Sequence, residues 1–180
     1  MTKPSSKLWL CQAIDGLIRR ISSAAAWLNA VLILVIIAQV VLRYAFGKGM
    51  VVLEELQWHL YAVAFMVGLA YVLTEDANIR LDILHSRFSR RTREVIEICG
   101  IVLLLTPFIV IFFTHSLDFV ANAWRVGERS DAPMGLPFRW AIKAVIPFSF
   151  GLLFLAALSR LLKAVAYLSG TPEDRADGHQ

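Results

Sequence analysis

Few residues in this chain have a type and spacing that could support chemistry. The histidines lie in separate segments: His59, His85, His115 and His179. No two of them stand at the i, i+4 spacing that puts two ligands on one helix face, and Cys11 and Cys99 are also isolated. No motif typical of a catalytic nucleophile with its base appears, and no glycine-rich loop could cradle a phosphate. The sequence therefore predicts a protein that is not an enzyme and holds no cofactor or metal of its own.

Arg43, Glu54 and Glu55 form the one group of charges that stands out. Arg43 ends the first long apolar stretch, and the two glutamates precede the second after a short connection. An unpaired charge at partial membrane depth is costly, so we expect these opposite charges to pair and to fix the hairpin. The alternative is that all three are exposed to water and lipid headgroups.

A path for ions or solutes would need ionisable side chains within the membrane. The candidates are His59, about one turn inside the second apolar stretch, and Glu97, near the start of the third. If several copies brought these side chains together, they could line a channel or a self-sufficient small transporter, which is the alternative function. A membrane cytochrome would need paired histidines, and His59 and His115 allow a single haem at most.

The elements that must position these residues follow from composition. Of the 180 residues, 58% are hydrophobic, and the charges fall in blocks separated by long uncharged stretches. A helix needs about 20 apolar residues to cross a bilayer. Four stretches reach or approach that length: about 22–42, 56–73, 95–116 and 140–166. The predicted fold is an all-α integral membrane protein, with a four-helix membrane domain over residues 22–168.

Residues 1–21 are predicted to form a cytoplasmic tail and an amphipathic helix that lies in the membrane surface. Between Leu8 and Ile21 apolar residues recur at helical spacing, with charged residues between them. The basic residues expected near lipid headgroups are Arg19, Arg20, Arg90, Arg91 and Arg93. Packing of the helix on a partner subunit is the alternative, and the two arrangements can coexist.

The distribution of lysine and arginine predicts the topology. Twelve of these residues lie on the side of the two chain ends and the 75–94 block, against six on the other side. Basic residues accumulate on the cytoplasmic side, so both termini are expected there, including a disordered tail over 169–180. The same topology accounts for the net charge of +4, and nucleic acid is not expected as a partner.

Pro107 lies near the middle of the third predicted span, where its missing backbone N–H predicts a kink. Thr106 stands beside it, and we expect its hydroxyl to satisfy a freed backbone group. Pro147 is expected to bend the first turns of the fourth span.

Several features taken in order resemble a known family. An amphipathic lead-in precedes a span that ends in Arg43-Tyr44, and the acidic pair Glu54–Glu55 follows. Two short motifs come later: Asn78-Ile79-Arg80-Leu81-Asp82-Ile83-Leu84 and Ala132-Pro133-Met134-Gly135-Leu136-Pro137. Over about residues 10–168 the chain resembles the DctQ-type small membrane subunit of tripartite ATP-independent periplasmic (TRAP) transporters.

This resemblance implies a function in the bacterial inner membrane. Such transporters couple a sodium gradient to the uptake of organic acids captured by a periplasmic, DctP-type binding protein. A large DctM-type membrane subunit holds the substrate and sodium sites, so the small subunit would bind no cofactor. It would instead act as a scaffold that packs against the large subunit among phospholipid, and it would offer surface to the binding protein.

Overall fold

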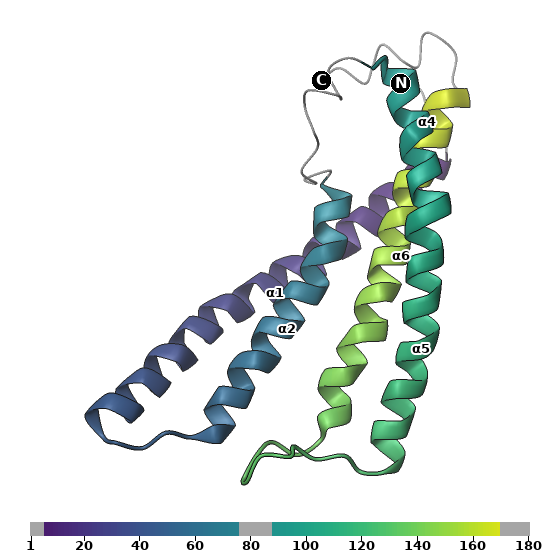
Figure 1. Ribbon diagram of the computed structural model, residues 1–180. Helices are drawn as coiled ribbons and strands as arrows, with labels where there is room; N and C mark the ends of the chain where they lie inside the picture. Colours follow the sequence, from purple (N-terminus) through teal and green to yellow (C-terminus); the bar gives the residue numbers. More distant parts are fainter. Residues whose placement is uncertain (1–5, 76–87, 170–180) are drawn as a thin grey trace.

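The computed structural model describes residues 6–75 and 88–169 of the chain (Figure 1). Its elements in chain order are α1 (Ser6–Ala45), α2 (Val51–Thr74), α4 (Arg90–Gly100), the π-helix η1 (Ile101–Leu105), α5 (Thr106–Arg125) and α6 (Arg139–Ser169). The described residues contain no β-strand. Because α4, η1 and α5 follow one another without a break, these elements make four long helical stretches.

All four helical stretches are long and apolar enough to cross a membrane. They run over Trp9–Ala45, Val51–Thr74, Arg90–Arg125 and Arg139–Ser169. Each contains one of the predicted spans, so the all-α membrane fold is confirmed. The cytoplasmic location of both termini remains a prediction.

α1 is one continuous helix of 40 residues, and the surface helix expected within residues 1–21 is not set off from the first span. The expected junction, Ser22 to Ala26, ends in three consecutive alanines and holds no proline or glycine, so nothing interrupts the helix. At 1.5 Å per residue α1 is about 60 Å long, twice the hydrocarbon thickness of about 30 Å. In Figure 1 it lies oblique to α5 and α6.

α6 is the central helix and contacts every other one of these elements. One buried apolar cluster joins it to α1 and α2: Ile18, Ala25, Val67, Ala70, Leu152 and Ala156. A second joins it to η1 and α5: Ile101, Ile109, Phe150, Leu153 and Ala157. In its most apolar stretch 39% of the residues are buried, against 11% in each of the other three, so α6 supplies a larger share of the interior than any other helix.

The helix is irregular just before Pro107, where the π-helix η1 ends two residues ahead of the proline, and the kink itself remains a prediction. The backbone N–H and the hydroxyl of Thr106 both donate to the Ile101 carbonyl, the hydroxyl at 2.8 Å. The hydroxyl therefore stabilises the wide π-turn itself. Pro147 lies buried within α6.

The bundle has two ends that carry the polar contacts. At the N/C end α1 begins, α2 ends, α4 begins and α6 ends; at the loop end lie the connections 46–50 and 126–138. The motif from Asn78 to Leu84 and the tail from residue 170 onward lie outside the described residues.

Candidate functional site

At the loop end, Glu55 joins α2 to the connection between α5 and α6. Its carboxylate accepts hydrogen bonds from the Ser130 hydroxyl and, at 2.6 Å, from the Leu136 backbone N–H. These donors lie 75 and 81 positions along the chain from Glu55. Hydrogen bonds to an ionised group are stronger than those between neutral groups. Glu55 therefore anchors the loop on the α1–α2 hairpin.

The loop is folded tightly around Ser130. Its hydroxyl donates to Glu55 and also accepts from the Ala132 N–H at 3.3 Å, while its own N–H donates to the Leu136 carbonyl at 3.4 Å. Two residues of this loop, Met134 and Phe138, have positive φ angles of 63° and 62°. Such angles are unfavourable for residues with a side chain and persist where the surroundings impose them. The shape of the loop is thus set by its contacts.

Gly135 packs directly against this anchor. A Cβ atom at this position would lie 2.5 Å from Ser130 Cβ and 2.8 Å from a Glu55 carboxylate oxygen, which is closer than non-bonded atoms approach. We expect Gly135→Ala to displace the loop and to lower the free energy of unfolding by about 1–3 kcal/mol, measured by thermal unfolding in detergent. Gly49→Ala is the control, because an added Cβ there meets nothing within 4 Å. Equal losses in the two variants would contradict tight packing at Gly135.

Ion pairs hold the same loop on the start of α6. Glu128 pairs with Lys143 and lies 3.7 Å from Arg139, which also contacts Asp131 at 3.2 Å. The Lys143 ammonium group lies 3.8 Å from the centre of the Phe119 ring, where a cation–π attraction adds to the pairing. The loop is therefore fixed on two sides, to α2 by a carboxylate anchor and to α6 by these pairs.

Large apolar side chains are exposed on and beside this fixed loop. Met134 is 89% exposed and Phe138 is 67% exposed. Trp124 and Val126, at the end of α5, are exposed as well. We call these four residues the loop surface. Aromatic residues and methionine are enriched in protein interfaces, so a rigid loop that displays them is suited to recognition.

The ion pairs expected between Arg43 and the two glutamates are absent among the described residues. Glu54 instead accepts a hydrogen bond from the Gln39 amide at 3.2 Å. Gln39, one turn before Arg43, is buried and supplies the contact to α2, whereas Arg43 is exposed at the end of α1. Glu55 is turned toward the 126–138 loop. Among the described residues the two glutamates thus contact separate, uncharged partners, and the pairing with Arg43 remains a prediction.

At the N/C end, Asp15 of α1 is buried against α6, with 9% of its surface exposed. It accepts a hydrogen bond from the Ser159 hydroxyl at 2.7 Å and forms an ion pair with Lys163. The thiol of Cys11, one turn earlier, donates to the Ser159 carbonyl at 3.7 Å. A buried carboxylate is tolerated where it is paired and hydrogen-bonded. These contacts hold the first turns of α1 on α6.

Two more ion pairs lie at this end. Arg160 of α6 binds Glu97 of α4 through two hydrogen bonds, one of them 2.6 Å long. Arg19 of α1 meets Glu75, just past the end of α2, at 2.5 Å. Glu97 was a candidate for lining a path for ions or solutes. The structure places it in a bidentate ion pair with Arg160 that joins α4 to α6.

The other basic residues predicted at lipid headgroups differ in their contacts and in their exposure to solvent. The Arg90 guanidinium lies 4.5 Å from the centre of the Tyr167 ring, and Arg93 donates to the Phe88 carbonyl at 3.0 Å. Three of these side chains are exposed: Arg20, Arg90 and Arg91. Contact with headgroups remains a prediction for all of these residues.

His59 points its Nδ1 atom at the Glu55 carbonyl, 2.5 Å away within α2. With Trp58, Arg139 and other residues it lines a cavity of about 530 Å³ beside the anchored loop. His115 lies on α5, where its Nδ1 atom is 2.9 Å from the Ile111 carbonyl. Among residues 6–75 and 88–169, no group of three His, Cys, Asp or Glu side chains could hold a metal ion. The polar groups of both ends are thus arranged to join helices and loops.

The model of the DctQ family, described as the DctQ component of tripartite ATP-independent periplasmic transporters, matches residues 32–166. The chain belongs to the DctQ family. A comparison with curated proteins gave no match. This DctQ chain is therefore a small membrane subunit of a TRAP transporter, and its family works with DctM and DctP components.

Sequence reasoning found both halves of the DctQ loop anchor without connecting them. It singled out Glu55 and the motif from Ala132 to Pro137, but it did not include Ser130. The contact of Asp15 with Lys163 was missed. Both residues were predicted close to the same membrane face, and their opposite charges could have indicated an ion pair. The family match begins at residue 32, so Asp15 lies outside it.

Proposed function

We propose that this DctQ chain is the non-catalytic scaffold subunit of a sodium-coupled TRAP transporter for organic acids. It packs against the large DctM-type subunit, which binds sodium and substrate, and it supports the static part of that subunit in the bacterial inner membrane. Both of its termini lie in the cytoplasm. The loop surface faces the periplasm, where it is available to the DctP-type binding protein.

The observation that carries this proposal is the fixation of the bundle at both ends. At the N/C end, ion pairs attach α1 and α4 to α6. At the loop end, Glu55 attaches the 126–138 loop to α2, and Lys143 attaches it to α6. Subunits that alternate between conformations need interfaces that slide or rotate. The ion pairs and hydrogen bonds at both ends oppose such motion, so the bundle is suited to act as a static support.

The loop surface supports the proposed contact with the binding protein. A recognition surface is most effective when it is ordered before binding, because little entropy is then lost on association. The Glu55 anchor provides that order, and the exposed Met134 and Phe138 provide apolar contact area. Sodium coupling and the organic-acid substrate rest on the family membership.

Reconstitution in liposomes tests the scaffold function. Vesicles that contain this chain and the large subunit are expected to take up an organic acid when the binding protein and an inward sodium gradient are supplied. Vesicles that contain this chain alone are expected to show no flux. The two membrane subunits are also expected to co-purify in detergent. Solute flux through the chain alone would overturn the proposal and favour a channel formed by several copies.

A further inference from the structure

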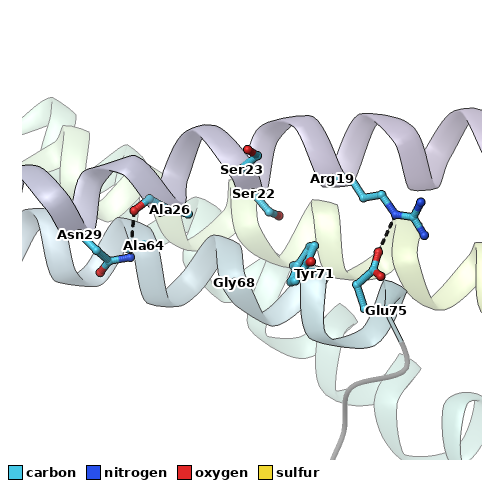
Figure 2. Close-up of a pocket in the computed structure, with 9 residues that line it drawn as sticks. All are labelled: Arg19, Ser22, Ser23, Ala26, Asn29, Ala64, Gly68, Tyr71 and Glu75. Carbon is cyan, nitrogen blue, oxygen red and sulfur yellow. Dashed lines mark hydrogen bonds and ion pairs between the residues drawn. The ribbon is translucent and has the colours of Figure 1, made fainter.

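A groove near the N/C end is lined by residues of α1 and α2 and by Glu75, just past the end of α2, as Figure 2 shows. Its lining residues are Arg19, Ser22, Ser23, Ala26, Asn29, Ala64, Gly68, Tyr71 and Glu75, and its volume is about 630 Å³. The ion pair between Arg19 and Glu75 lies at one end. From Arg19 to Asn29 the groove follows α1 for about 15 Å. It therefore extends from the C-terminal end of α2 toward the membrane interior.

The walls of this groove are made largely of small side chains. Gly68 lies well inside α2, where glycine is less favourable than alanine by about 0.5–1 kcal/mol. An added Cβ at Gly68 would meet nothing within 4 Å, so the packing of this chain does not require glycine there. In membrane proteins, small residues on a helix surface allow a neighbouring helix backbone to approach closely. A helix from another chain would explain the glycine.

One polar group in the groove lacks a hydrogen-bond partner, and a second can accept a further bond. Ser22 is only 8% exposed, and its hydroxyl has no hydrogen-bond partner among the described residues. Figure 2 shows this side chain directed from α1 toward α2. The Asn29 amide nitrogen donates to the Ala26 carbonyl at 3.3 Å, and its amide oxygen is left to accept a further bond. Polar groups without partners are costly in a bilayer, so these two call for a ligand that hydrogen-bonds.

We propose that a transmembrane helix of the large DctM-type subunit docks in this groove. It carries a small residue where it crosses Gly68 and a polar side chain that hydrogen-bonds Ser22 or Asn29. A lipid acyl chain has no such group, and lipid headgroups remain at the membrane surface, whereas the groove continues inward to Asn29. This inference rests on the proposed scaffold function and names the surface through which the scaffold holds its partner.

Site-specific photo-crosslinking in the assembled transporter tests the docking. A benzophenone side chain is placed at Ser23, which lines the groove, or at its neighbour Ala24, which is exposed and outside it. The adduct at Ser23 is expected to contain a membrane helix of the large subunit, identified by mass spectrometry of the cross-linked peptide, and Ala24 is expected to give little of it. Adducts at Ser23 with phospholipid only, adducts with a second copy of this chain, or equal yields at both positions would overturn the inference.

A second variant fills the groove. Gly68→Leu is expected to reduce the amount of co-purified large subunit roughly ten-fold, which corresponds to 1.4 kcal/mol of binding. The isolated chain should retain its thermal stability, because the space at Gly68 is open. Gly100→Leu is the control, since an added Cβ on α4 also meets nothing within 4 Å. Normal assembly of Gly68→Leu would reject the groove but leave the scaffold function standing, whereas failure of the native subunits to co-purify would reject the scaffold function itself.

Discussion

Asp15→Ala is expected to lower the free energy of unfolding by about 2–4 kcal/mol, because it leaves Lys163 and the Ser159 hydroxyl without their shared acceptor. Loss of one member of a fully buried pair costs about 3–5 kcal/mol, and the range is set lower here because Lys163 is 35% exposed. Thermal unfolding in detergent measures the effect. Fluorescence of Trp9, on the same part of α1, should report release of this segment at a lower temperature than unfolding of the rest, when the other four tryptophans are replaced by phenylalanine.

Asp118→Ala is the matched control for this prediction. Asp118 is an exposed acidic residue on α5, so its removal should change the unfolding temperature little. The double variant Asp15→Ala/Lys163→Met should recover much of the lost stability, because the unpaired ammonium group is then also removed. If Asp15→Ala unfolded at the same temperature as Asp118→Ala, the contact between α1 and α6 would not be a stabilising one.

Glu55→Ala is expected to release the 126–138 loop. The loop loses two hydrogen bonds to a carboxylate, and in hydrogen exchange the Leu136 amide should lose roughly a hundred-fold of its protection. In reconstituted transporters, uptake should fall while the large subunit still co-purifies, because the loop surface is disordered and the helices remain packed. Glu55→Gln should have an intermediate effect, since its amide oxygen can still accept from Leu136.

The neighbouring carboxylate provides the control for the loop anchor. Glu54→Ala removes a group that contacts Gln39 on α1 and makes no contact with the loop. Leu136 should therefore stay protected in this variant, and uptake should be near normal. Loss of Leu136 protection in Glu54→Ala, or its retention in Glu55→Ala, would show that the loop is held by other contacts.

The four spans were predictable because their signal is local. A run of about twenty uncharged residues has one stable form in a bilayer, the helix, in which every backbone group is satisfied within the segment. The signal for an irregular helix near Pro107 was equally local, since a missing N–H acts on its own turn. The continuity of α1 was missed because hydropathy marks where a helix enters the membrane, while the alanines at residues 24–26 keep the helix unbroken across that boundary.

The polar contacts were harder to predict because their partners are distant in sequence. Arg43 was paired with Glu54 and Glu55 on the grounds of charge and a short connection, but proximity along the chain did not fix which side chains face each other. Glu55 bonds a loop 75 residues away, and Asp15 bonds a lysine 148 residues away. Such partners depend on the angles and positions at which the helices cross, and the pattern of residues in a single sequence does not specify these.

The central place of α6 has a consequence for biosynthesis. This helix follows every other described element along the chain, so it is the last of them to leave the ribosome. Until α6 enters the bilayer, the Asp15 carboxylate lacks its partners Ser159 and Lys163. Both buried apolar clusters also lack the residues that α6 contributes. The α1–α2 hairpin can pack before α6 is inserted, but closure of the whole bundle waits for the end of translation. Nascent chains that stop short of α6 should be open to membrane-bound quality-control proteases.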